Sequence, residues 1–144
     1  MRSARLLWTI GSLLAILVAT VAPAQDTGNI QGAWTVVSAE RDAKPTAEVA
    51  GHRLTFSGDT FTIQHEGHAL YRGTYSVDPS RKPASIDFLH GEGTLKGKSW
   101  KGIYRLDGEA LKICDNAPNT AKARPTRFAA SSGYICIVFK RATG

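Results

Sequence analysis

The sequence is a succession of short segments in which apolar and polar residues alternate, each bounded by residues that favour turns. Such alternation is typical of β-strands that turn one face to a core and the other to water. Turn signals such as Asp107-Gly108 join the segments as hairpins. The eight segments are 34–39, 53–56, 60–64, 70–77, 86–88, 100–106, 110–114 and 134–140. They predict an all-β fold, an eight-stranded antiparallel up-and-down barrel, because closure leaves no sheet edge exposed.

The first segment begins with Gly32-Ala33-Trp34, and we expect the Trp34 indole to plug one end of the barrel. Gly32 lets the chain turn tightly beneath the ring. Regular alternation divides this strand into two faces, with Trp34, Val36 and Ser38 on one and Thr35, Val37 and Ala39 on the other. The polar stretch 41–50 is predicted to be a connection with one short helical turn.

The N-terminus has the features of a secretory signal peptide, residues 1–24. Arg2 and Arg5 precede an apolar run over 6–21, and Ala22-Pro23-Ala24 supplies the small residues of a cleavage site. An uncleaved membrane anchor is the alternative. Cleavage after residue 24 leaves one domain, 25–144, with no stable membrane insertion and a periplasmic or secreted location.

The charge and composition of that domain limit the classes of partner that it is expected to bind. Removal of Arg2 and Arg5 lowers the 18 Lys and Arg residues to 16, against 12 Asp and Glu residues, which leaves a net charge of +4. The basic residues are scattered, without the stripe of cations and aromatics that binds nucleic acid, so we predict no nucleic-acid partner. The remaining partners are a small apolar ligand or a protein of the cell envelope.

Two strands carry the same pattern: aromatic, basic, Gly, any residue, Tyr, any residue, aliphatic, Asp. They are 71–78 and 100–107. A Gly within a strand marks a bend, a bulge or a close backbone approach. One interpretation is strand curvature, with aromatic rings packed over each Gly. The other is a gap for a ligand, and its four predicted ligand-binding residues are Tyr71, Tyr75, Trp100 and Tyr104.

An ordered set of motifs along the chain resembles a family of uncharacterised lipocalin-like domains that is abundant in planctomycete bacteria. The motifs are 30–40, Leu54-Thr55-Phe56 with Gly58-Asp59, 71–75, Pro83 with Ile86-Asp87-Phe88, Gly102-Ile103-Tyr104 with Leu106-Asp107-Gly108, 111–114, and Arg124-Pro125-Thr126 with Phe128. The resemblance implies a lipocalin-like barrel and no established activity. Wider lipocalins pair the Gly-x-Trp of the first strand with a basic residue that ends the last strand. Arg141, or Lys140, has that position and could form a structural cation–π contact with Trp34.

The two cysteines have the phase of a cross-strand pair. Cys114 shares its strand face with Lys112, and Cys136 shares its face with Lys140, so both thiols are expected on the outside of neighbouring strands. An even number of cysteines in an exported protein favours a disulfide. The sequence favours the disulfide but does not exclude two free thiols.

The sequence predicts no metal site, no cofactor and no catalytic residues. His65-Glu66-Gly67-His68 lacks the helical spacing of a zinc motif. A zinc site would need further ligands, and no pattern in the sequence places His52 or His90 beside this segment. Asp87 lies between two apolar residues, so its carboxylate is expected to point out of its strand. There is no nucleophile elbow and no Gly-rich phosphate loop.

Taken together, these features favour an exported, non-enzymatic, lipocalin-like protein that binds a small, mostly apolar ligand at the open end of its barrel. The alternative is a protein-interaction or inhibitor module on a filled barrel. Its contacts would come from the loops 91–97 and 115–132, because binding residues concentrate on loops that a rigid scaffold holds.

Overall fold

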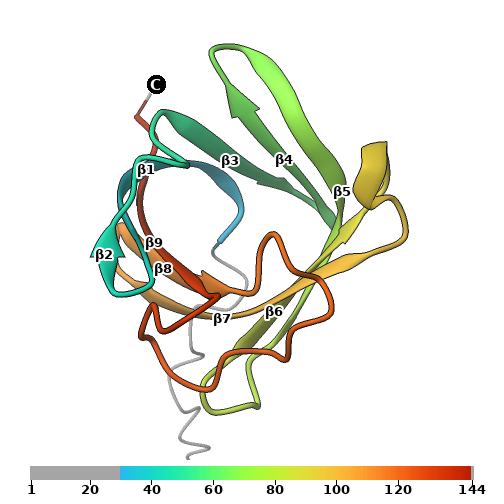
Figure 1. Ribbon diagram of the computed structural model, residues 1–144. Coiled ribbons are helices and arrows are strands. Elements are labelled where there is room, and N and C mark those ends of the chain that lie inside the picture. The colour runs from blue at the N-terminus through green and yellow to red at the C-terminus, as the bar shows by residue number, and fades with distance from the viewer. Residues whose placement is uncertain (1–29, 144) are drawn as a thin grey trace, which may run out of the picture.

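The computed structural model describes residues 30–143, and Figure 1 shows one sheet that curves around a common interior. The predicted signal peptide and its cleavage site lie outside these residues. The strands are β1 (Gly32–Arg41), β2 (Lys44–Pro45), β3 (His52–Ser57), β4 (Thr60–His65), β5 (His68–Asp78), β6 (Ser85–His90), β7 (Ser99–Asp107), β8 (Ala110–Asp115) and β9 (Ile135–Arg141). A single 3₁₀ turn, η1 (Gly93–Leu95), lies in the predicted loop 91–97. Within residues 30–143 no helix has the length and apolar character needed to cross a bilayer.

Eight of the strands close into the predicted barrel. Consecutive strands pair antiparallel from β3 to β9, and β1 pairs with both β3 and β9. The ninth strand, β2, pairs only with the end of β1. This hairpin lies in the connection 41–50, where a short helical turn was predicted. That prediction was wrong, because Asp42 and Ala43 adopt positive φ in a tight β-turn, and 47–50 forms a second turn.

One end of the barrel is closed as expected. The Trp34 side chain is fully buried, and its indole N–H donates to the carbonyl of Ile30 at 2.8 Å. The Arg141 guanidinium lies 4.3 Å from the centre of the indole ring and donates to the carbonyl of Gln31 at 2.8 Å. Lys140, the other candidate, is paired with Thr35 and exposed. The cation–π contact is therefore made by Arg141.

A β-bulge overturns the predicted faces of the first strand. The pairing of β1 with β9 shifts between Val36 and Ser38, so that Val37 is an extra residue and is 57% exposed. Beyond the bulge Ala39 is buried and Ser38 is exposed, the reverse of the prediction. Regular alternation assumed no inserted residue. The same shift turns Arg41 toward the barrel interior, where its Cα partner is the buried Ile135.

The predicted disulfide is present. Cys114 and Cys136 are direct cross-strand partners, and their sulfur atoms are bonded. They lie on the outer face of β8 and β9 but are buried, because the long connection between these strands (orange in Figure 1) covers them with Phe128 and Ala130. Arg124 holds this connection to the sheet through an ion pair with Asp87 at 2.6 Å. The outer wall thus carries a second small core beneath the loop.

Candidate functional site

The barrel contains a cavity of about 190 Å³ at the end opposite Trp34. Its wall is mostly aliphatic and aromatic, and three charged side chains and one histidine lie at its mouth. The lining side chains are Val36, Arg41, Glu48, Val49, His52, Leu54, Ile63, Tyr71, Phe88, Trp100, Ile113, Asp115, Ala117, Pro118, Ile135, Ile137 and Phe139. An apolar pocket with a few polar groups at one side is the usual form of a small-molecule site.

The structure separates the four predicted ligand-binding aromatics into two pairs. Tyr71 and Trp100 line the cavity, and their rings lie 4.8 Å apart between centres in an edge-to-face arrangement. Tyr75 and Tyr104 also face inward, but both pack into the core away from the cavity lining. The Tyr75 hydroxyl donates to the carbonyl of Gly58 at 2.9 Å, on the same side as the buried Trp34. Only the first pair is therefore placed to contact a ligand in this cavity.

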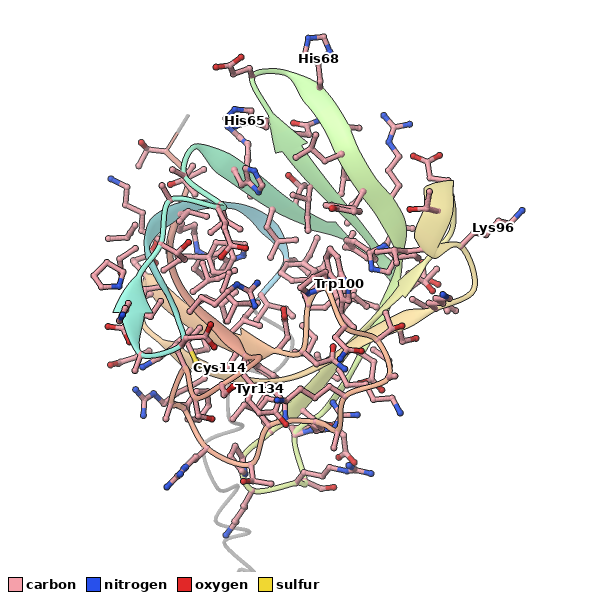
Figure 2. All side chains as sticks on the ribbon, in the orientation of Figure 1. His65, His68, Lys96, Trp100, Cys114 and Tyr134 are labelled. Carbon is pink, nitrogen blue, oxygen red and sulfur yellow. A yellow bond between two sulfur atoms is a disulfide. The ribbon has the colours of Figure 1, made fainter. Side chains whose placement is uncertain are left out.

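Trp100 is held from behind by a buried histidine. The His90 ring is 1% exposed and lies edge-to-face against Trp100, with 4.1 Å between ring centres. Tyr71 and Phe61 contact the same imidazole through edge-to-face packing. Burial lowers the pKa of His90, which keeps the ring neutral. Figure 2 shows Trp100 inside the barrel, so this aromatic cluster forms one wall of the cavity.

The two strand glycines adjoin neighbouring backbone. A Cβ at Gly73 would stand 1.9 Å from the carbonyl oxygen of Leu89, and one at Gly102 would stand 2.7 Å from that of Cys114. No side chain fits there without moving a strand. Both glycines therefore permit close strand approach, which supports the curvature interpretation, and neither lines the cavity.

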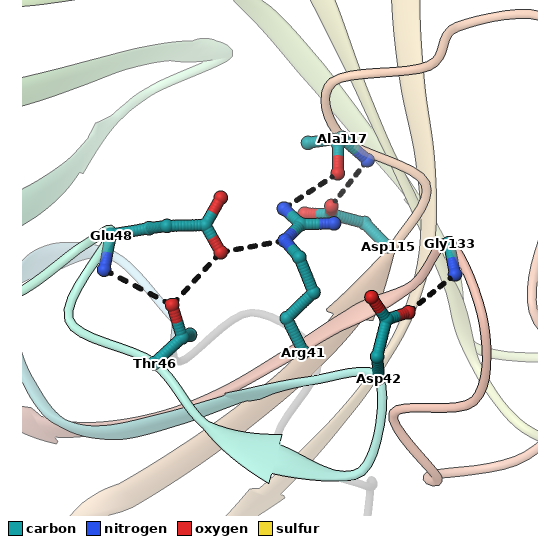
Figure 3. Close-up of polar contacts among 7 residues, drawn as sticks. All are labelled: Arg41, Asp42, Thr46, Glu48, Asp115, Ala117 and Gly133. Atoms are coloured by element: carbon teal, nitrogen blue, oxygen red, sulfur yellow. Dashed lines mark hydrogen bonds and ion pairs between the residues drawn. The ribbon is translucent and has the colours of Figure 1, made fainter.

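The mouth carries a polar cluster that the sequence analysis missed (Figure 3). Arg41, turned inward by the bulge, donates through Nε to Glu48 Oε2 at 2.6 Å and through Nη2 to the carbonyl of Ala117 at 3.0 Å. Asp115 ends β8 on the same inner face as Ile113, and its Oδ1 accepts the Ala117 N–H at 2.9 Å. Alternation from Leu111 through Ile113 to Asp115 was the signal that could have found this carboxylate.

These charged groups have different environments. Asp115 is 5% exposed, and burial raises its pKa to about 6, although the Ala117 N–H and the Arg41 charge act in the opposite direction. Glu48 is half exposed, and its hydrogen bond from Arg41 lowers its pKa. Burial and the neighbouring His65 lower the pKa of His52, which favours the neutral ring. At neutral pH the mouth therefore holds one guanidinium and two carboxylates.

His65 and His68, which the sequence analysis did not assign to a metal site, lie at the tip of the β4–β5 hairpin, as Figure 2 shows. His65 pairs with His68 across the hairpin and with His52 on β3, and the His52 and His65 rings are 5.2 Å apart. Across residues 30–143, no three His, Cys, Asp or Glu side chains come together in a way that could hold a metal ion.

The site combines a small apolar chamber with one nearly buried carboxylate at its entrance. A carboxyl whose pKa lies near neutrality can anchor a ligand or exchange a proton with it. The described lining holds no Ser, Thr, Cys or Lys side chain, which are common nucleophiles. Comparison of the chain with protein families, with curated proteins and with solved structures finds no match.

Proposed function

We propose that this protein is an exported, lipocalin-like binding protein, without enzymatic activity, that holds a small, mostly apolar ligand in its barrel cavity. The observation that carries the proposal is the 190 Å³ chamber itself, walled by Leu54, Ile113 and Ile137 among others and reaching solvent past half-exposed Glu48. Such a chamber favours an apolar ligand, because the burial of the ligand's apolar surface drives binding.

The chamber limits the size of the ligand. An apolar protein cavity of about 150 Å³ holds benzene. A chamber of about 190 Å³ accommodates one aromatic ring with a short substituent, and the open mouth leaves room for a polar head. Long-chain fatty acids and retinoids exceed it. Tyr71 and Trp100 are the ligand-contacting aromatics in this proposal.

Two further features support the lipocalin-like assignment and the location. The closed end joins Gly32, Trp34 and Arg141 as the resemblance implies, with the guanidinium 4.3 Å from the ring centre. The Cys114–Cys136 disulfide is typical of an oxidising compartment and accords with a cleaved leader over residues 1–24.

A matched pair of variants tests the chamber. Val36→Phe places a ring in the chamber, whereas Val37→Phe places the same ring on the outer side of the bulge. We expect toluene and indole to bind the wild type and Val37→Phe in calorimetric titrations, and to bind Val36→Phe at least about tenfold more weakly because the ring occupies their space. Equal affinity in the two variants, or no binding to the wild type, would exclude the cavity and favour the loop-mediated interaction module.

A further inference from the structure

The charge of the cavity mouth is opposite to that of the chain. The full sequence carries a formal net charge of +6, yet the cavity lining holds Arg41 against Glu48 and Asp115. The histidine of the lining, His52, has a lowered pKa, which favours its neutral form at physiological pH. One negative charge is therefore left over at the entrance of an otherwise apolar chamber.

The single guanidinium is already engaged. Arg41 donates to Glu48 and to the carbonyl of Ala117, so its fork is directed at two protein acceptors. A carboxylate or phosphate ligand that accepted hydrogen bonds from the remaining N–H groups of Arg41 would lie beside the Asp115 and Glu48 carboxylates. Two negative charges that are shielded from water repel each other strongly, because the local dielectric constant is low. This repulsion disfavours anionic ligands.

Asp115 is placed to receive a cation. Its strand, β8, sends Leu111, Ile113 and Asp115 to the inner face, so the carboxylate continues the apolar wall on which a ligand body would rest. Its Oδ1 accepts a hydrogen bond from the Ala117 N–H at 2.9 Å. A desolvated carboxylate of this kind gains most from a charged donor. Tyr71 and Trp100 line the same chamber, and aromatic rings attract cations and other rings.

We infer that the ligand of this cavity is a small primary amine, an aromatic or aliphatic body in the chamber with its ammonium group on Asp115. The inference rests on the proposed function and adds the chemical class of the ligand. The ammonium group neutralises the surplus charge of the mouth and leaves the Arg41–Glu48 pair intact. The apolar body meets the aliphatic wall and the Tyr71–Trp100 pair.

Three probes with the same phenethyl body and different heads test this: phenethylamine, phenethyl alcohol and hydrocinnamate. Affinities are measured by calorimetry on the oxidised mature chain, in a buffer alkaline enough to ionise Asp115. We expect the amine to bind at least about tenfold more tightly than the alcohol, and hydrocinnamate to bind most weakly. Asp115→Asn should abolish the amine's advantage, so that the amine and the alcohol bind the variant with similar affinity.

Glu40→Gln is the matched control, because it removes one carboxylate from the outer face of β1, next to Arg41 in the chain. It should leave all three affinities unchanged. Amine and alcohol binding equally, or hydrocinnamate binding most tightly, would overturn the amine inference while the cavity function stands. If none of the three probes binds, the proposed function fails as well. An equal loss in both variants would assign the effect to general electrostatics and overturn the role of Asp115.

Discussion

Replacing Asp115 by Asn should stabilise the protein at neutral pH. The side chain is 5% exposed, and its pKa is raised from 3.8 to about 6 by burial. This increase in pKa means that ionisation of the carboxyl lowers the unfolding free energy of the wild type by about 3 kcal/mol. Asparagine keeps the oxygen that accepts the Ala117 N–H and carries no charge, so the variant avoids this loss.

The sign of the pH dependence follows from where the proton is held more tightly. The folded state binds the Asp115 proton more tightly than the unfolded state, so the stability of the wild type falls as pH rises through the interval between 3.8 and about 6. The variant lacks this term. We expect the difference in unfolding free energy to be small at about pH 4 and to reach about 3 kcal/mol at about pH 8.

Urea denaturation of both proteins across this interval measures the difference. His52 and His90 have lowered pKa values, so their contribution to stability is lost as pH falls, the opposite direction. Both proteins contain these histidines, so their contribution cancels when the unfolding free energy of one protein is subtracted from that of the other. Glu40→Gln, which removes an exposed carboxylate from β1, is measured alongside as the control. A difference that is independent of pH for Asp115→Asn would refute the desolvation of this carboxyl, on which its role as a charged anchor depends.

Three other perturbations test the scaffold. Replacing Cys114 and Cys136 by Ser should lower the unfolding free energy by about 3 kcal/mol in urea titrations, because the bridge closes a loop of 22 residues, and an unchanged midpoint would contradict this. Gly73→Ala should cost about 2–3 kcal/mol because its Cβ would lie 1.9 Å from a backbone carbonyl, whereas Gly91→Ala meets its nearest atoms at 3.5 Å and should cost less than about 1 kcal/mol. Arg141→Met should lower thermal stability by about 1–2 kcal/mol and alter the fluorescence of the buried indole, since it removes both the cation–π contact and the hydrogen bond to the Gln31 carbonyl; intact stability would show that these contacts are dispensable.

Where the strands are regular, alternation was sufficient to predict the structure. The phase that put Cys114 with Lys112 and Cys136 with Lys140 depends on two strands without an inserted residue, and the register of β8 and β9 is continuous. Side-chain direction in such strands has a period of two and is independent of tertiary packing. The closed barrel and the inward orientation of the repeated aromatics therefore followed from the sequence, which also favoured the disulfide without deciding it.

Alternation gives the face of a residue but not its depth along the barrel. Tyr71 and Tyr75 share a face, yet four residues of strand separate them by about 13 Å. One reaches the chamber and the other reaches the closed end beside Gly58. The distinction depends on strand stagger, which long-range pairing sets and local sequence does not encode. Trp100 and Tyr104 are divided for the same reason.

The bulge at Val37 decides the chemistry of the cavity mouth. In an unbroken strand, the alternation that starts at Trp34 would turn Glu40 inward and Arg41 to solvent. The mouth would then hold three carboxylates, with Glu48 and Asp115, and no guanidinium. The inserted residue replaces Glu40 by Arg41 at the inward position. The net charge of the cavity mouth therefore changes from three negative charges to one. Three desolvated carboxylates would repel and take up protons, whereas one guanidinium between two of them leaves a single carboxylate charge for a ligand. A one-residue irregularity that alternation does not reveal therefore gives this barrel end the charge that the proposed amine site requires.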